Sequence, residues 1–304
     1  MEESVISNSK IPVGQSIRYA YTFTFGHLGA IIGLIWVPML IVSIGSFFSF
    51  SYYTSSLSAA LAQGTPETAG QAAGLMLGWT VVGLGLTSMM YASVAELALG
   101  LRKGSPLYHF AFGANEMRVF GGLAALMGVM ILFVLGYLLA VGLVSAAGTA
   151  AGGGNPVVAL IVAVLALAGY LAIIYAMVRL SFLLIPATVA ENAVSLARSW
   201  KLTQGNFWRI FAIGICTLLP LILVMLVAEA AIFGPDFYTM PPDSGAAPDM
   251  AQEMKLIGQQ MSMMNAHLPA LMGLSFVLSP LWAGLLVAPA AYAYRALVPA
   301  RGQV

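Results

Sequence analysis

The sequence predicts an all-α, polytopic membrane bundle, and three observations support this prediction. The first is composition, because 60% of the 304 residues are hydrophobic and only 8% are charged, against about a quarter in a water-soluble domain. The second is a set of six continuous apolar stretches. The third is the uneven distribution of basic residues among the connecting segments. The composition and the net charge of +1 exclude an ordinary soluble enzyme, a disordered chain and a nucleic-acid-binding protein.

Each of the six apolar stretches is long enough to cross the hydrocarbon core of a bilayer, which needs about 20 residues in a helix. Their apolar residues run on without alternating with polar ones, so the pattern favours helices over the strands of a barrel. The six predicted spans are Leu28–Phe50, Gly74–Leu99, Val119–Val144, Val157–Val178, Phe207–Phe233 and Leu268–Ala296.

Basic residues gather in alternate connecting segments and thereby predict the orientation of the chain. Only Lys255 of the 12 lysines and arginines falls in a segment on the outer side of the predicted membrane. The others lie before span 1 (Lys10, Arg18), between spans 2 and 3 (Arg102, Lys103, Arg118), between spans 4 and 5 (Arg179, Arg198, Lys201, Arg209) and after span 6 (Arg295, Arg301). Because cytoplasmic loops carry the excess of Lys and Arg, both termini are expected in the cytoplasm.

A short amphipathic helix is predicted before each odd-numbered span, at the cytosolic interface. The apolar faces of the three helices are Val13, Ile17, Ala20 and Thr24; Leu107, Phe110, Ala111 and Ala114, opened by Ser105-Pro106; and Val189, Ala193, Leu196 and Trp200. Thr24 and Gly26 also align with Thr203 and Gly205. We therefore expect one membrane domain of three tandem units, each an interfacial helix and a helical hairpin, over residues 12–100, 105–182 and 186–298, with an outer loop at 234–267.

Three segments resemble a known bacterial membrane domain: "IPVGQSIRYAYTFTFGHLGAIIGLIWVPML", "PATVAENAVSLARSWKLTQGNFWRIF" and "PAAYAYRAL". This six-span domain precedes some glycerophosphodiester phosphodiesterases and also occurs alone in bacterial membrane proteins. The resemblance implies a place in the bacterial inner membrane. In the fused proteins a separate soluble barrel carries the hydrolase chemistry. That barrel has no counterpart in this sequence, so phosphodiesterase activity is not expected here.

No motif for catalysis or for a cofactor is found in the sequence. The three histidines, His27, His109 and His267, lie in different segments without a partner at metal-ligand spacing. No phosphate-binding glycine loop and no nucleophile elbow is present. The sequence therefore predicts a protein that is not an enzyme, with no catalytic residue, no cofactor and no resident metal.

Charges near the membrane predict one interhelical ion pair, since a charge in lipid is costly unless it is paired or at the rim. Glu96 lies near the inner end of span 2, while Arg179 and Arg295 hold corresponding positions in spans 4 and 6. We expect Glu96 to pair with one or both arginines. The alternative is that all three side chains extend separately to water.

Basic and aromatic residues alternate before span 5 and predict contacts to lipid headgroups of the inner leaflet. The residues are Arg198, Lys201 and Arg209, with Trp200 and Trp208 between them. Each basic residue near an anionic surface contributes about 1 kcal/mol of attraction. The alternative is that these cations only set the topology.

Methionines on the outer side recur at helical spacing. Met250, Met254, Ile257, Met261 and Met264 share one face of a helix. This face favours an interfacial or partner-docking helix. A Cu(I) site made of thioether sulfurs is the alternative.

The sequence thus favours a non-enzymatic integral membrane protein: a scaffold, a lipid-homeostasis factor or an assembly partner. Its expected partners are membrane lipids and other membrane proteins. The alternative is a transporter of small solutes or of lipids, a flippase. A bundle filled by side chains favours the first interpretation, and a polar cavity or a lipid-shaped groove favours the second.

Overall fold

The computed structural model describes residues 10–63, 66–102, 110, 112–150, 156–194, 196–234 and 250–298, and these residues form helices and connecting turns with no strand. Six of the helices are long and apolar enough to cross a membrane, which confirms the all-helical prediction. They are α2 (Leu28–Gln63), α3 (Pro66–Leu99), α4 (Ala114–Ala150), α5 (Pro156–Ser181), α8 (Phe207–Phe233) and α9 (Met250–Leu297). Three short helices accompany them, α1 (Val13–Gly26), α6 (Leu184–Glu191) and α7 (Leu196–Leu202).

The short helices differ from their predicted forms in two of three places. In α1 the predicted face is buried at Ala20 and Thr24. Of the second predicted helix, Leu107 and Ala111 lie outside the described residues. Phe110 is not helical, and Ala114 begins α4. The third was predicted as one helix over 189–200.

That third helix is divided by Asn192, which has a φ of 54° and ends α6 in the left-handed region. Asparagine tolerates this conformation better than most residues, so the chain turns there and restarts as α7. The prediction of one continuous helix at this place was wrong.

The predicted outer loop at 234–267 also needs correction. Helix α9 begins at Met250 and continues without interruption to Leu297, through Pro269, Pro280 and Pro289. The methionine face therefore belongs to the same helix as the sixth span. Each of these prolines lacks a backbone N–H donor. The helical turns on both sides of each proline nevertheless continue, so α9 stays one helix.

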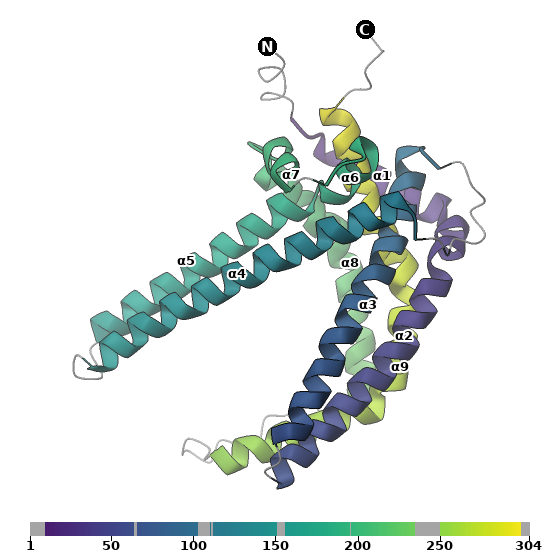
Figure 1. Ribbon diagram of the computed structural model, residues 1–304. Helices are drawn as coiled ribbons and strands as arrows, with labels where there is room; N and C mark the ends of the chain where they lie inside the picture. Colours follow the sequence, from purple (N-terminus) through teal and green to yellow (C-terminus); the bar gives the residue numbers. More distant parts are fainter. Residues whose placement is uncertain are drawn as a thin grey trace.

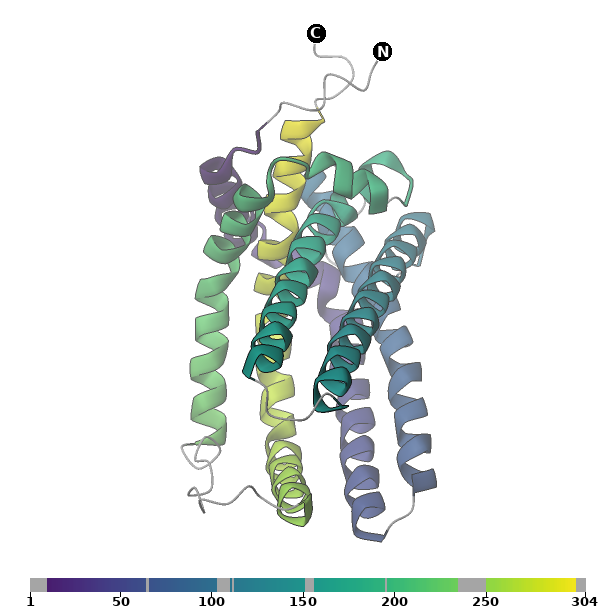
Figure 2. The ribbon, with the colours of Figure 1, turned by 90° about the vertical axis from the view of Figure 1, so that its left-hand side faces the viewer.

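The long helices separate into two groups (Figures 1 and 2). Helices α2, α3, α8 and α9 form one group, in which α2 contacts α3 and both contact α9, while α8 contacts α9. Helices α4 and α5 contact each other and form an arm that diverges from the first group. The short helices lie at the end where the two groups meet, as do Lys10 and Val298, the first and last described residues.

Many of the fully buried side chains lie at this junction. Fully buried side chains from α2, α3 and α9 meet there, among them Ile31, Leu34, Val94 and Val287. By contrast, no residue is buried in the most apolar windows of α4 and α5. The arm is therefore held mainly through its end at the junction.

Glycine notches bring neighbouring helices close together. A Cβ atom at Gly45 of α2 would overlap the ring of Trp79 of α3, whose indole N–H donates to the Ser46 hydroxyl at 3.0 Å. Likewise, a Cβ at Gly169 of α5 would overlap the ring of Tyr137 of α4. Small residues at such contacts let an aromatic ring seat directly against a neighbouring backbone.

Prolines within the long helices free backbone carbonyls that side chains then satisfy. Pro220 has no N–H for the carbonyl of Cys216, and the Tyr21 hydroxyl of α1 donates to that carbonyl at 2.8 Å. Pro280 leaves the carbonyl of Phe276 without its helical donor, and the Ser279 hydroxyl donates to it at 2.8 Å. In lipid, each backbone group needs such an internal partner.

Candidate functional site

Positive charge is concentrated at the end of the molecule where the two groups of helices meet. The described side chains there include three carboxylates, Glu96, Glu116 and Glu191. The described cations at the same helix ends are Lys10, Arg18, Arg102, Arg118, Arg179, Arg198, Lys201, Arg209 and Arg295. Among the described residues, this end, where the short helices also lie (Figure 1), is therefore strongly electropositive.

Arg179, near the end of α5, is the most buried of these cations, with 5% of its surface exposed. Its guanidinium lies over the Trp200 ring at 3.8 Å from the centroid. It donates to the Tyr175 hydroxyl at 2.9 Å, to the carbonyl of Trp200 and to the Thr203 hydroxyl. These neutral oxygens and the aromatic face hold the cation in place.

The described residues bring no carboxylate within ion-pair distance of Arg179. The predicted pair between Glu96 and Arg179 or Arg295 is not formed among the described residues. The Glu96 carboxylate lies 3.6 Å from Arg102 and accepts a hydrogen bond from Asn115 at 2.9 Å. These contacts tie the end of α3 to the beginning of α4.

Arg295 instead lies over the ring of Tyr19, 5.2 Å from its centroid. This contact joins the end of α9 to α1. Arg179 and Arg295, which hold corresponding positions in the sequence, thus each lie over an aromatic ring. They do not share a carboxylate partner among the described residues.

Two of the arginines predicted to contact lipid headgroups make contacts within the protein. Arg198 pairs with Glu191 at 3.0 Å. Arg209 donates to the carbonyl of Ile11 at 2.8 Å, while the Asn206 side-chain oxygen accepts from the Ile11 N–H at 3.1 Å. Asn206 and Arg209 therefore fix the segment that leads into α1. No signal in the sequence pointed to this long-range contact.

The remaining predicted headgroup residues are more accessible. Trp208 is 75% exposed and Trp200 is 36% exposed, and Lys201 is also exposed. Trp208 packs against Phe207 and Phe211. These side chains lie at the cationic end.

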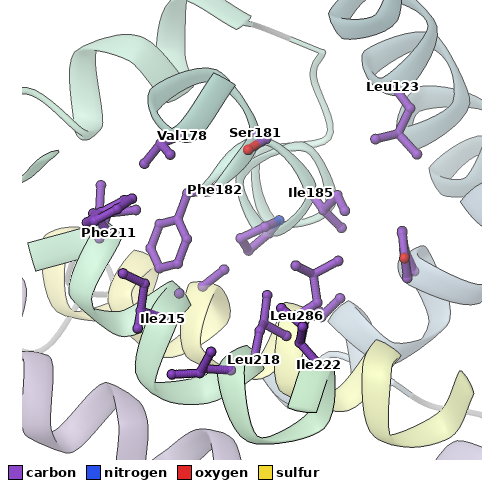
Figure 3. A pocket seen from close by; sticks show the side chains of 17 residues that line it. Leu123, Val178, Ser181, Phe182, Ile185, Phe211, Ile215, Leu218, Ile222 and Leu286 are labelled. Atoms are coloured by element: carbon purple, nitrogen blue, oxygen red, sulfur yellow. The ribbon is translucent and has the colours of Figure 1, made fainter. Parts of the chain in front are cut away.

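An apolar cavity of about 440 Å³ lies directly inside the cationic end. Its wall is built by six helices, α3, α4, α5, α6, α8 and α9, at the point where the arm meets the other helices (Figure 3). Phe182, Ile185, Phe211 and Leu286 are among the side chains that line it. Ser181 and Tyr91 are the only two lining residues that carry a side-chain hydroxyl.

This cavity was not foreseen from the sequence, because its lining residues come from six helices and have no common spacing. One lining residue, Gly214, stands out in the sequence because it has no side chain. Gly214 leaves a gap in an otherwise bulky stretch of α8, and a Cβ atom there would meet no atom within 4 Å.

A second cavity of about 290 Å³ lies between α2, α3, α8 and α9. Its wall includes Met39, Met225 and Trp282, and it shares Tyr91 with the first cavity. The Tyr91 side chain also interacts with Trp282. Tyr91 therefore lines both cavities.

Within the described ranges no cluster of three metal-binding side chains is formed by His, Cys, Asp and Glu. His27 stacks on Phe23 at 4.8 Å between ring centroids, and His267 contacts Phe233 edge-on. His109 lies outside the described residues, as do the side chains of Met250, Met254 and Ile257. The copper site therefore stays an untested prediction.

Outside the long helices, Tyr21 of α1 has a pKa above its ordinary value. Burial is the main cause, and the neighbouring Cys216 adds to it. The hydroxyl thus stays protonated and able to donate to the Cys216 carbonyl.

No family model matches this chain. Comparison with curated proteins and with solved structures also found no match. The resemblance to the six-span bacterial domain therefore stays a prediction.

Proposed function

We propose that this protein is a non-enzymatic integral protein of the bacterial inner membrane that acts as a scaffold or lipid-homeostasis factor. It belongs to the six-span family that its sequence resembles. The six long helices cross the bilayer as three hairpins, α2–α3, α4–α5 and α8–α9, and both termini face the cytoplasm.

One observation carries this proposal: large apolar side chains cover the outside of the long helices, while cations gather at one end. Leu132, Leu77 and Val227 are each about 70% exposed. A soluble protein rarely leaves so large an apolar surface in water. Acyl chains solvate these side chains, and the cationic end faces the cytoplasm.

The short helices support the same orientation. Helices α1, α6 and α7 lie at the cationic end (Figure 1), and Phe25 of α1 and Trp208 of α8 are exposed there. We assign α1 and α7 to the cytosolic interface, with their aromatic neighbours among the headgroups.

The cavity beside α6 favours a role with lipids over the transport of small polar solutes. Its lining residues are almost all apolar, and a polar solute needs hydrogen-bond partners along its path. Among the alternatives, lipid transport therefore agrees better with the described cavities than solute transport does.

Cysteine accessibility tests the proposed topology. In a Cys216→Ser background, we introduce Gln204→Cys at the cationic end or Gln260→Cys in α9 at the opposite end, since both glutamines are exposed. A maleimide that cannot cross membranes should label Gln260→Cys in spheroplasts and Gln204→Cys only after the membrane is broken. Labelling of both positions, or of Gln204→Cys alone, in sealed spheroplasts contradicts the proposal.

A further inference from the structure

We propose that the cavity between the arm and the other helices binds one acyl chain of an anionic membrane lipid, with the headgroup at the cationic end. This inference rests on the proposed membrane location and names the ligand class of the site. It is supported by the chemistry of the wall, by the size of the cavity and by the charge next to it.

The cavity reaches the lipid-facing surface along α8. Ile215, Leu219 and Ile222 line it and are each more than a third exposed. In a bilayer the medium at that opening is hydrocarbon, and the wall offers dispersion contacts with almost no polar group to satisfy. An acyl chain therefore enters without loss of hydrogen bonds.

The size of the cavity excludes a transmembrane helix as its occupant. A helix with its side chains is about 10 Å wide, so 440 Å³ holds roughly one turn of it. The volume lies instead within the range of about 300–1,000 Å³ that is typical of small-molecule sites. A single lipid chain suits such a space, whereas a helix of a second copy does not.

The charge next to the cavity selects an anionic headgroup. Val178 and Ser181 line the cavity on either side of Arg179, and the lining residue Ile210 directly follows Arg209. The described carboxylates near this end, three against nine cations, leave it electropositive. Arg179 in particular has only neutral partners among the described residues.

Native mass spectrometry of the full chain in mild detergent tests the proposal. The protein is titrated with dioleoyl phosphatidylglycerol or with dioleoyl phosphatidylcholine, and bound lipid is counted. Gly214→Phe fills the cavity from a position where a Cβ meets no atom. Gly128→Phe is the matched control, since Gly128 of α4 has the same free space and does not line the cavity. Gly214→Leu is a smaller second variant.

The unmodified chain and Gly128→Phe should retain one phosphatidylglycerol, about tenfold more tightly than phosphatidylcholine. Gly214→Phe or Gly214→Leu, at an unfolding temperature that shows a folded protein, should weaken this binding about tenfold. Equal retention by a folded Gly214 variant overturns the acyl-chain site, and equal affinity for the two lipids overturns the anionic headgroup. Either failure leaves the cysteine-labelling pattern unchanged, so it is distinguishable from a failure of the proposed topology.

Discussion

At the scale of single residues, polar side chains donate hydrogen bonds to backbone carbonyls that have no helical N–H donor. Tyr21 is an example, because its hydroxyl donates to the Cys216 carbonyl, which Pro220 leaves without a helical donor. The carbonyl lies on an exposed part of α8, and in the proposed membrane location the surrounding lipid offers it no hydrogen-bond donor. The tyrosine therefore links α1 to the place in α8 where Pro220 removes a backbone hydrogen bond.

Tyr21→Phe should lower the free energy of unfolding by about 1–3 kcal/mol, since it leaves that carbonyl without a donor. In a Pro220→Ala background the loss should be smaller, because the alanine backbone supplies the missing N–H. Unfolding by denaturing detergent, measured for the four chains of this double-mutant cycle, checks the coupling. An equal loss in both backgrounds contradicts the role assigned to the proline.

At the scale of elements, contacts between neighbouring helices depend on where a bulky ring meets a glycine. Trp79 of α3 occupies the space above Gly45 of α2, and its indole N–H bonds to Ser46. The charged side chains act at the ends of elements, as Glu96 does between α3 and α4 through Arg102 and Asn115. Helix pairs are thus held by close steric fit along their length and by polar contacts at their ends.

We expect Gly45→Ala to displace the Trp79 ring and to lower the free energy of unfolding by about 1–3 kcal/mol. Gly78→Ala, in α3 next to Trp79, is the control, because a Cβ there meets no atom within 4 Å and alanine favours the helix. Thermal unfolding in detergent measures both. A Gly45→Ala chain as stable as the Gly78→Ala chain would show that the notch has no energetic role.

At the scale of the whole molecule, the α4–α5 arm joins the other helices mainly at the cationic end. The most apolar windows of α4 and α5 contain no buried residue, and the arm diverges from α3 toward the opposite end (Figure 1). Few contacts restrain its far half, and such regions are the most mobile parts of a structure. The cavity lies where the arm begins, so we expect any motion of the arm to change its opening.

Spin labels should reveal this motion. A pair at Leu139 of α4 and Leu77 of α3, both exposed, should give a broader distance distribution than a pair at Phe48 of α2 and Leu77, because α2 contacts α3 closely. Pulsed electron–electron double resonance in lipid nanodiscs measures both pairs. Distributions of equal width contradict an arm that moves independently.

The helices and their apolar character could be predicted from the order of the amino acids, because continuous apolar runs about 20 residues long favour a single kind of backbone in lipid. The same order located the cations at alternate helix ends. It did not reveal how side chains pair: Glu96 meets Arg102 rather than Arg179, and Arg209 meets the backbone of Ile11. The contact between Arg209 and Ile11 and the cavity became visible in the folded chain alone, because each depends on how residues far apart in the chain approach one another in space.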